Sequence, residues 1–133
     1  DHPLIQNGTE FSARLELVGA SANSTTVFPN ILTTAAFYII NEKWFCCPGA
    51  VLQNAVAMYE SSLDMQHLIF VSPFLWDDLQ TVQYENKTVA WLLAVPISEN
   101  ERQYAEEKGT DALEDLFEQH QIDIYDLSRL SLL

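Results

Sequence analysis

Two adjacent carboxylates, Asp77 and Asp78, are the side chains of this sequence whose types and spacing come nearest to acid–base chemistry. A hydrolase can use one carboxyl group as the acid and a second as the base, provided that both face one pocket and differ in pKa. Neighbouring side chains on the loop expected after Pro73 usually point apart instead. The pair therefore does not predict a hydrolytic site.

Cys46 and Cys47 are the second set of reactive groups, and they are adjacent as well. This arrangement suits neither a disulfide framework nor a zinc site, in which a short spacer separates the ligands of each pair. The histidines His2, His67 and His120 stand apart from any serine or cysteine motif, although a distant histidine could still meet Cys47 in space. We expect buried free thiols, no metal or other cofactor, and no catalytic residue.

Sequence motifs for nucleotide chemistry and for nucleophilic catalysis do not occur. The four glycines are too far apart for a phosphate-binding loop, and there is no Gly-x-Ser-x-Gly elbow. A binding function is therefore favoured over an enzymatic one.

Negative charge is the strongest bulk property of the chain. Asp and Glu number 19 against 6 Lys and Arg, which gives a net charge of −13, and residues 98–126 hold a large share of the carboxylates. Such a charge argues against direct binding to nucleic acid or to an anionic membrane, and it favours a basic protein partner. The alternative is that the charge serves only to keep the protein soluble. Hydrophobic residues make up 48% of the 133 residues, so the chain has a core.

The chain shows one strand pattern and one helix pattern in its first third. Residues 10–19 alternate between apolar and polar side chains, which predicts a strand with one buried face. Residues 31–42 carry apolar side chains at helical spacing, which predicts a largely buried helix. Residues 44–58 mix helix and turn signals and support no single assignment.

Three further strands are predicted before the acidic segment. Residues 66–72 form a short apolar run that stops before Pro73. Residues 79–84 and 88–95 flank a short polar turn and predict a hairpin. Because residues 88–95 are apolar on both faces, this strand is expected to be central in its sheet.

The acidic segment is predicted to form two helices. Ser98 and Glu101 have the spacing of a capping box, and Gly109 is placed to stop the first helix. Thr110 or Asp111 is expected to cap the second. The buried stripe of the second helix is predicted to consist of Leu113, Leu116 and Phe117.

Only part of the acidity has a local explanation. Carboxylates in the first turn of a helix gain about 0.3–1 kcal/mol each from the helix dipole. The first-turn positions are those of Glu99, Glu101, Asp111 and Glu114. The later turns, where this gain is lost, hold Glu106, Glu107, Asp115 and Glu118. The second group is the one that a functional account has to explain.

Residues 89–129 resemble the C-terminal part of the suppressor of fused-like domain. The resemblance lies in an apolar strand that ends in proline, a helix with glutamate, a glycine stop, a leucine-rich helix and a closing Asp…Arg. The matching positions are Pro96, Glu101, Tyr104, Gly109, Leu113, Leu116, Asp126 and Arg129. Residues 11–21 and 65–74 are similar to further elements of the domain, so the chain resembles a single domain over residues 1–133 that lacks its N-terminal part.

This resemblance implies a fold and a class of function. The fold is α+β, with a mixed, mainly antiparallel sheet flanked by helices, and most matching positions are structural, with Asp126 and Arg129 as a local ion pair. Bacterial members resemble immunity proteins, or antitoxins, that neutralise a toxin, often a nuclease. The animal domain binds a transcription-factor peptide and holds it in the cytoplasm.

The resulting hypothesis is a cytoplasmic antitoxin whose acidic surface covers the active site of a basic nuclease toxin. Exposed acids would speed the encounter, and aromatic side chains beside them would add affinity. The candidate partner-binding residues are Phe74, Trp76, Asp77, Asp78, Tyr84, Glu85, Glu106, Glu107, Asp115 and Glu118. The alternative hypothesis is a regulatory module that sequesters a partner by adding one of the partner's strands to its own sheet.

Overall fold

The computed structural model describes residues 4–6, 9–11, 13–20, 27–42, 46–72, 82–84, 88–124 and 126–133. For residues 4–6, 9–11, 13 and 14 the backbone alone is described. The strands are β1 (Leu4–Gln6), β2 (Thr9–Phe11), β3 (Ala13–Val18), β4 (Val51–Leu52), β5 (Met65–Val71), β6 (Val82–Gln83) and β7 (Thr88–Ser98). The helices are α1 (Val27–Asn41), α2 (Glu99–Lys108) and α3 (Thr110–His120).

The main sheet is mixed and mainly antiparallel, as predicted. Its strand order is β3-β7-β5-β4, and β6 also pairs with β7. The pairing of β3 with β7 is parallel, whereas β7 pairs antiparallel with β5 and β6, and β4 pairs antiparallel with β5. The central place of β7 and its hairpin pairing with β6 are confirmed for the described residues. Strands β1 and β2 form a separate antiparallel pair.

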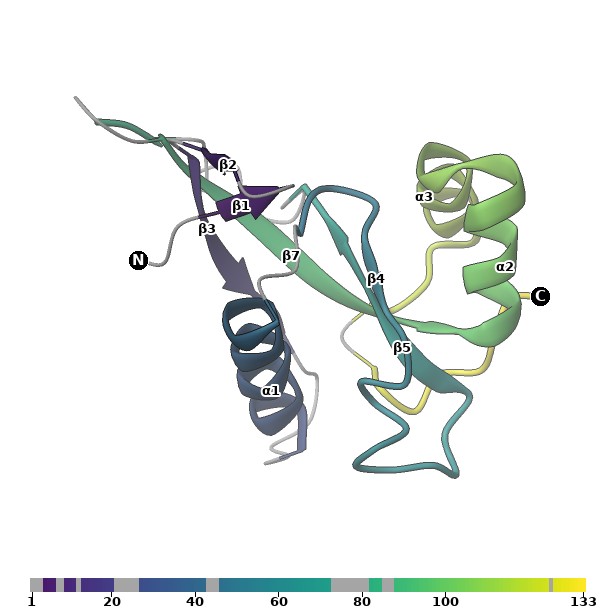
Figure 1. Ribbon diagram of the computed structural model, residues 1–133. Helices are drawn as coiled ribbons and strands as arrows, with labels where there is room; N and C mark the ends of the chain where they lie inside the picture. The colour runs from purple at the N-terminus through teal and green to yellow at the C-terminus, as the bar shows by residue number, and fades with distance from the viewer. Residues whose placement is uncertain are drawn as a thin grey trace.

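Helices cover both faces of the main sheet, with α1 on one side of β5 and β7 and the α2–α3 pair on the other (Figure 1). Successive side chains of a strand point to opposite faces. Accordingly, Leu68 and Phe70 of β5 join the buried cluster on the α1 side. Ile69 and Val71 join the cluster that contains Leu113 and Phe117 of α3. Burial on both faces explains why β5 and β7 are almost continuously apolar.

Helix α1 differs from its prediction in its start and in its burial. It begins at Val27, before the predicted residue 31, because Pro29 lies in the first turn, where the missing N–H costs no hydrogen bond. Its buried residues are Phe28, Ile31 and Ala35, which share one helical face. The expectation of a largely buried helix was wrong, since Phe37 on the opposite face is 58% exposed.

The two acidic helices follow β7 without a loop. The predicted capping box is present, since Ser98 Oγ accepts from Glu101 N at 3.1 Å and Glu101 Oε1 accepts from Ser98 N at 3.0 Å. Gly109 ends α2 with a φ of +95°, a conformation that residues with a side chain rarely adopt. The same glycine precedes α3, so the expected cap at Thr110 or Asp111 was wrong and α3 has no side-chain cap.

The segment without a firm assignment contains strand β4 followed by turns over residues 53–59. The turn begins at Asn54, whose φ is +62°, and Ala55 and Val56 are buried behind it. Val56 N and Ala57 N both donate to Gln66 O of β5, at 3.1 and 3.2 Å, so the turns are tied to the sheet. Within the described ranges, no helix has both the length and the apolar character needed to cross a membrane.

Candidate functional site

The surface that best fits a binding function is one face of α3, which we call the acidic stripe: Asp111, Glu114, Asp115 and Glu118. Positions that follow one another by three or four residues lie on one side of a helix. The buried residues Leu113 and Phe117 lie on the opposite side, against the sheet. The fold therefore directs all four carboxylates of the stripe away from the core.

The acidic stripe is not offset by an ion pair in the part of the chain that the structure describes, although Lys108 ends α2 and His120 ends α3. Among the described residues, the ion pairs with lysine, arginine or histidine involve none of the four carboxylates. Partial burial raises the pKa of Glu114, and the charges of Asp111 and Asp115 raise it further. Like charges at these spacings destabilise a helix by about 0.2–0.5 kcal/mol per pair. Apart from the dipole gain of Asp111 in the first turn, the acidic stripe therefore costs stability.

The carboxylates of α2 are arranged differently, because most of them are paired. Arg102 binds Glu99 at 2.5 Å and Glu106 at 3.0 Å along one side of the helix. The hydrogen bond from Arg102 lowers the pKa of Glu99 to about 2, with smaller contributions from Gln103 and His67, and partial burial opposes the shift. The carboxylates along this side of α2 are thus paired with Arg102 and need no external partner to explain them.

Glu101 has a second role that its capping position does not reveal. Its side chain is fully buried and accepts hydrogen bonds from the two terminal nitrogens of Arg129, Nη1 and Nη2, each at 2.9 Å. Arg129 also donates to Pro96 O at 3.0 Å and lies over the Phe117 ring, 5.3 Å from its centroid. The predicted Asp126–Arg129 ion pair is therefore wrong, since Arg129 pairs with Glu101, and Asp126 Oδ1 accepts from the backbone N–H of Ser128.

The two free thiols were expected to be buried, and this is confirmed for Cys46, whereas Cys47 is only partly buried. Burial raises the pKa of the Cys46 thiol to about 12, so it stays protonated and unreactive. His67 is buried, and both its ring nitrogens are engaged, Nδ1 with Asn54 N at 2.9 Å and Nε2 with Glu99 at 2.5 Å. In the part of the chain that the structure describes, no three His, Cys, Asp or Glu side chains are grouped to hold a metal ion.

The predicted partner-binding residues fall into four sets. Asp115 and Glu118 lie in the acidic stripe, whereas Glu106 is paired with Arg102 and Glu107 is exposed near the end of α2. Tyr84 follows β6 and is 57% exposed. Outside the described residues lie Phe74, Trp76, Asp77, Asp78 and Glu85. Among the candidates that the structure describes, Asp115 and Glu118 are the two that lie together on one face.

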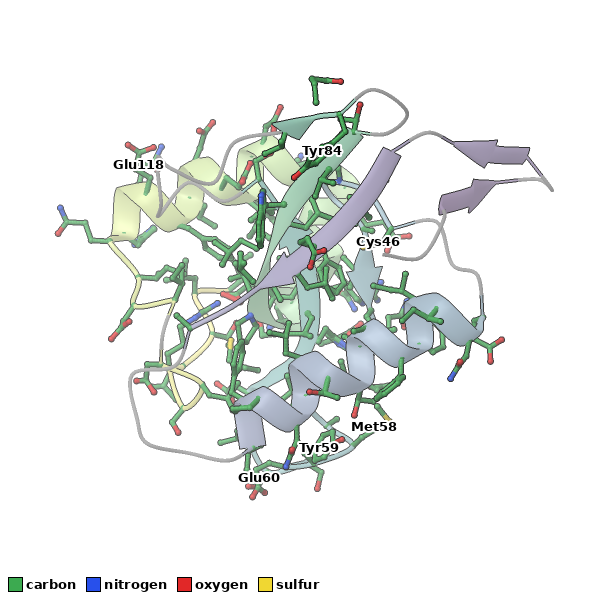
Figure 2. All side chains as sticks on the ribbon, turned by 90° about the vertical axis from the view of Figure 1, so that its left-hand side faces the viewer. Cys46, Met58, Tyr59, Glu60, Tyr84 and Glu118 are labelled. Atoms are coloured by element: carbon green, nitrogen blue, oxygen red, sulfur yellow. The ribbon has the colours of Figure 1, made fainter. Side chains whose placement is uncertain are left out.

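A second surface, which was not predicted from the sequence, consists of exposed apolar side chains. We call it the α1 patch: Phe37, Tyr38, Met58 and Tyr59. It lies on the far side of the sheet from Glu118, as Figure 2 shows for Met58 and Tyr59 beside α1. The signal was present in the sequence, because residues 27–41 contain no charged side chain although only one helical face can be buried.

Comparisons with known proteins give one consistent family. A family model described as suppressor of fused protein matches residues 2–130. Immunity protein YqcF of Bacillus subtilis strain 168 is 47% identical over 126 residues, which cover 94% of this chain and 65% of YqcF. The chain therefore spans just under two thirds of the length of this relative.

Solved structures share the fold at low sequence identity. A suppressor of fused homologue from Neisseria gonorrhoeae has a TM-score of 0.68 at 18% identity, covering 92% of this chain and 64% of that one. A chain of the Sufu–Fu complex has a TM-score of 0.63 at 14% identity, covering 82% and 46%. Drosophila Suppressor of Fused has a TM-score of 0.62 at 14% identity, covering 82% and 26%.

Proposed function

Because the chain belongs to the suppressor of fused family, we propose that it is an immunity protein that binds and neutralises a cognate toxin. The observation that carries this proposal is the 47% identity with immunity protein YqcF over 94% of the chain. Neutralisation requires only binding, so the proposal needs no catalytic residue and no cofactor. The absence of an enzyme signature in the sequence is compatible with it.

The chemistry of the surface suggests what kind of toxin is bound. The acidic stripe presents four carboxylates without a counter-ion in the described chain, and the whole chain carries a net charge of −13. A nuclease presents lysine and arginine where it holds the phosphates of its substrate. We therefore propose that the toxin is a basic nuclease domain in the cytoplasm and that the stripe covers its active site in place of the nucleic acid.

Charge would act mainly on the encounter, and affinity would need further contacts. Complementary potentials raise association rates by about 10 to 10³-fold, whereas each exposed ion pair adds at most about 1 kcal/mol. A nanomolar complex requires about −12 kcal/mol. Exposed aromatic residues are suited to supply the remainder, and Tyr84 is one such residue in the described chain. The expected contributions of Phe74 and Trp76 stay predictions.

Co-expression tests the proposal directly. Cells that express the toxin encoded beside this gene should survive when the wild-type chain is present. A triple variant of the exposed stripe residues, Asp111→Asn/Asp115→Asn/Glu118→Gln, should protect less. The matched control is Glu16→Gln/Glu42→Gln/Glu60→Gln, which removes the same charge at exposed positions elsewhere and should protect as the wild type does. Full lethality in the presence of the wild-type chain would reject the immunity function.

The outer edge of strand β3 supports a second candidate function, the binding of a partner peptide as an added strand. Strand β3 is the first strand of the order β3-β7-β5-β4, so its outer edge has no strand partner in the described sheet. Such an edge can accept an extended peptide, whose main chain would continue the hydrogen-bond ladder. A module of this kind would tolerate charge reversal at Glu106 and Glu107, and it would lose binding when proline interrupts the added strand of the partner.

A further inference from the structure

The solvent-facing side of α1 is unusual for a helix on the surface of an acidic protein. A surface helix normally carries charged residues on the face opposite its buried stripe. The exposed residues of α1 are Pro29, Asn30, Thr33, Phe37, Tyr38 and Asn41. This face therefore combines two exposed aromatic residues with uncharged ones, and no charged side chain would have to be desolvated when an apolar surface binds to it.

A neighbouring turn extends this apolar surface. Phe37 and Tyr38 are 58% and 44% exposed, and Met58 and Tyr59 are 63% and 43% exposed. The Tyr59 hydroxyl hydrogen-bonds with Thr34 Oγ1 and with Asn30 O of α1, so the turn and the helix form one surface. Contiguous apolar patches on monomers are usually small, and larger ones mark interfaces. Phenylalanine, tyrosine and methionine are enriched at the centres of such interfaces.

The turn is held rigidly before any partner arrives. Its start at Asn54 is fixed by the hydrogen bond of Asn54 N to the buried His67 ring, and Val56 behind it is fully buried. Met58 N donates to Asn54 O at 3.1 Å and Tyr59 N donates to Val56 O at 2.9 Å. A surface that is already ordered loses little conformational entropy on binding. The α1 patch is therefore built like the centre of an interface.

The charges around the patch decide what kind of partner fits it. The patch itself has no carboxylate that a lysine or arginine could meet, and the nearest described acids in sequence are Glu42 and Glu60 at its rim. A basic partner would gain more from the acidic stripe, which lies on the other side of the sheet (Figure 2). An uncharged apolar surface fits best against another uncharged apolar surface.

We infer that the α1 patch binds the same patch of a second copy of this chain, in a two-fold symmetric dimer. Two copies at −13 each repel one another, and the repulsion is smallest when the faces that meet carry no charge and the acidic stripes point away from each other. Contact through α1 points the acidic stripes away from each other and brings uncharged residues together at its centre, with Glu42 and Glu60 only at its rim. A two-fold interface is also self-complementary, so aromatic residues of one copy meet those of the other. Both acidic stripes stay open in this dimer.

Sedimentation velocity over a concentration series, at low and at high salt, tests the inference. The wild-type chain should form a species of twice the 15.1 kDa mass, and salt should strengthen the dimer because it screens the repulsion. Phe37→Glu should raise the dimer dissociation constant by at least about a hundredfold, since a symmetric interface receives the new carboxylate twice. Leu130→Glu is the matched control, because Leu130 is 78% exposed on the C-terminal segment, and it should leave the dimer intact.

Two results would overturn the inference. A wild-type chain that is monomeric at every concentration and salt, in the longest form that its gene encodes, would exclude the dimer. A dimer that Leu130→Glu dissociates and Phe37→Glu does not would place the contact elsewhere. Both results are read from the sedimentation data alone, so a failure of the proposed function would leave the inference standing.

Discussion

The start of α2 and the outer face of α3 carry the same kind of charge and use it in opposite ways. At the start of α2, Glu99 and Glu101 bind arginines and cap the helix, so their charges hold elements of the chain together. On α3, the acidic stripe has no counter-ion within the described chain, and partial burial together with the charges of Asp111 and Asp115 raises the pKa of Glu114. The comparison separates acidity that the fold uses from acidity that is available to a partner.

The buried pair of Glu101 and Arg129 should give the largest effect on stability. Arg129→Met leaves the fully buried Glu101 carboxylate without its partner, and breaking a buried pair in this way costs about 3–5 kcal/mol. Urea unfolding would measure this loss. The double variant Glu101→Gln/Arg129→Met removes both charges and should lose less than the single variant. A cost below about 1 kcal/mol for the single variant would mean that the pair is not structural.

The pH dependence of stability should show the paired character of Glu99. Its folded-state pKa of about 2 lies below the ordinary 4.5, so its contribution is present above pH 4.5 and is lost as the pH falls towards 2. Glu99→Gln should therefore destabilise the protein near neutral pH, by less than about 1 kcal/mol because the side chain is partly exposed. The difference between variant and wild type should vanish at pH 2. A difference that is independent of pH would contradict the ion pair.

The acidic stripe should give the smallest effect, with the opposite sign. The pKa of Glu114 is raised in the folded state, so its charge costs stability above that pKa, and the cost disappears below the ordinary 4.5. Glu114→Gln should stabilise the protein near neutral pH by about 0.2–0.5 kcal/mol. Thermal unfolding at several pH values would measure the gain. A destabilised variant would show that the stripe has a structural role after all, and the comparison with α2 would fail.

Features that depend on neighbouring residues could be predicted from the sequence. The capping box joins Ser98 to Glu101 three positions later, and the stop at Gly109 follows from the backbone freedom of glycine. The strands β5 and β7 were visible as apolar runs because both their faces are buried. In these cases the physical cause lies within a few residues of its effect.

Features that depend on distant residues could not be predicted in this way. Arg129 was assigned to nearby Asp126, because only the fold shows that Glu101 is fully buried and lies within reach of Arg129. The parallel pairing of β3 with β7 likewise leaves no local pattern. Helix α1 was expected to be buried from its apolar composition, but a helix against a sheet buries one face, and Phe37 lies on the other.

The candidate site was recovered in part. Asp115 and Glu118 were predicted as binding residues because they lie beyond the first helical turn. Asp111 and Glu114 were not, because the helix dipole was expected to stabilise them. The placement of Glu114 in the first turn was wrong, because α3 begins at Thr110 and only Asp111 lies in that turn. The dipole gain of Asp111 does not remove repulsion between carboxylates on one face, so the four residues belong together. The separation of Glu106 from this set required the contact with Arg102, which the structure supplies.

The association rate between this protein and the proposed toxin, measured across ionic strength, tests the role of the acidic stripe most directly. We predict a rate that falls steeply as salt rises. At low salt, Asp111→Asn/Asp115→Asn/Glu118→Gln should lower it by about tenfold or more, while the control Glu16→Gln/Glu42→Gln/Glu60→Gln changes it far less. Equal losses in the two triple variants, or a rate that does not respond to salt, would contradict the account.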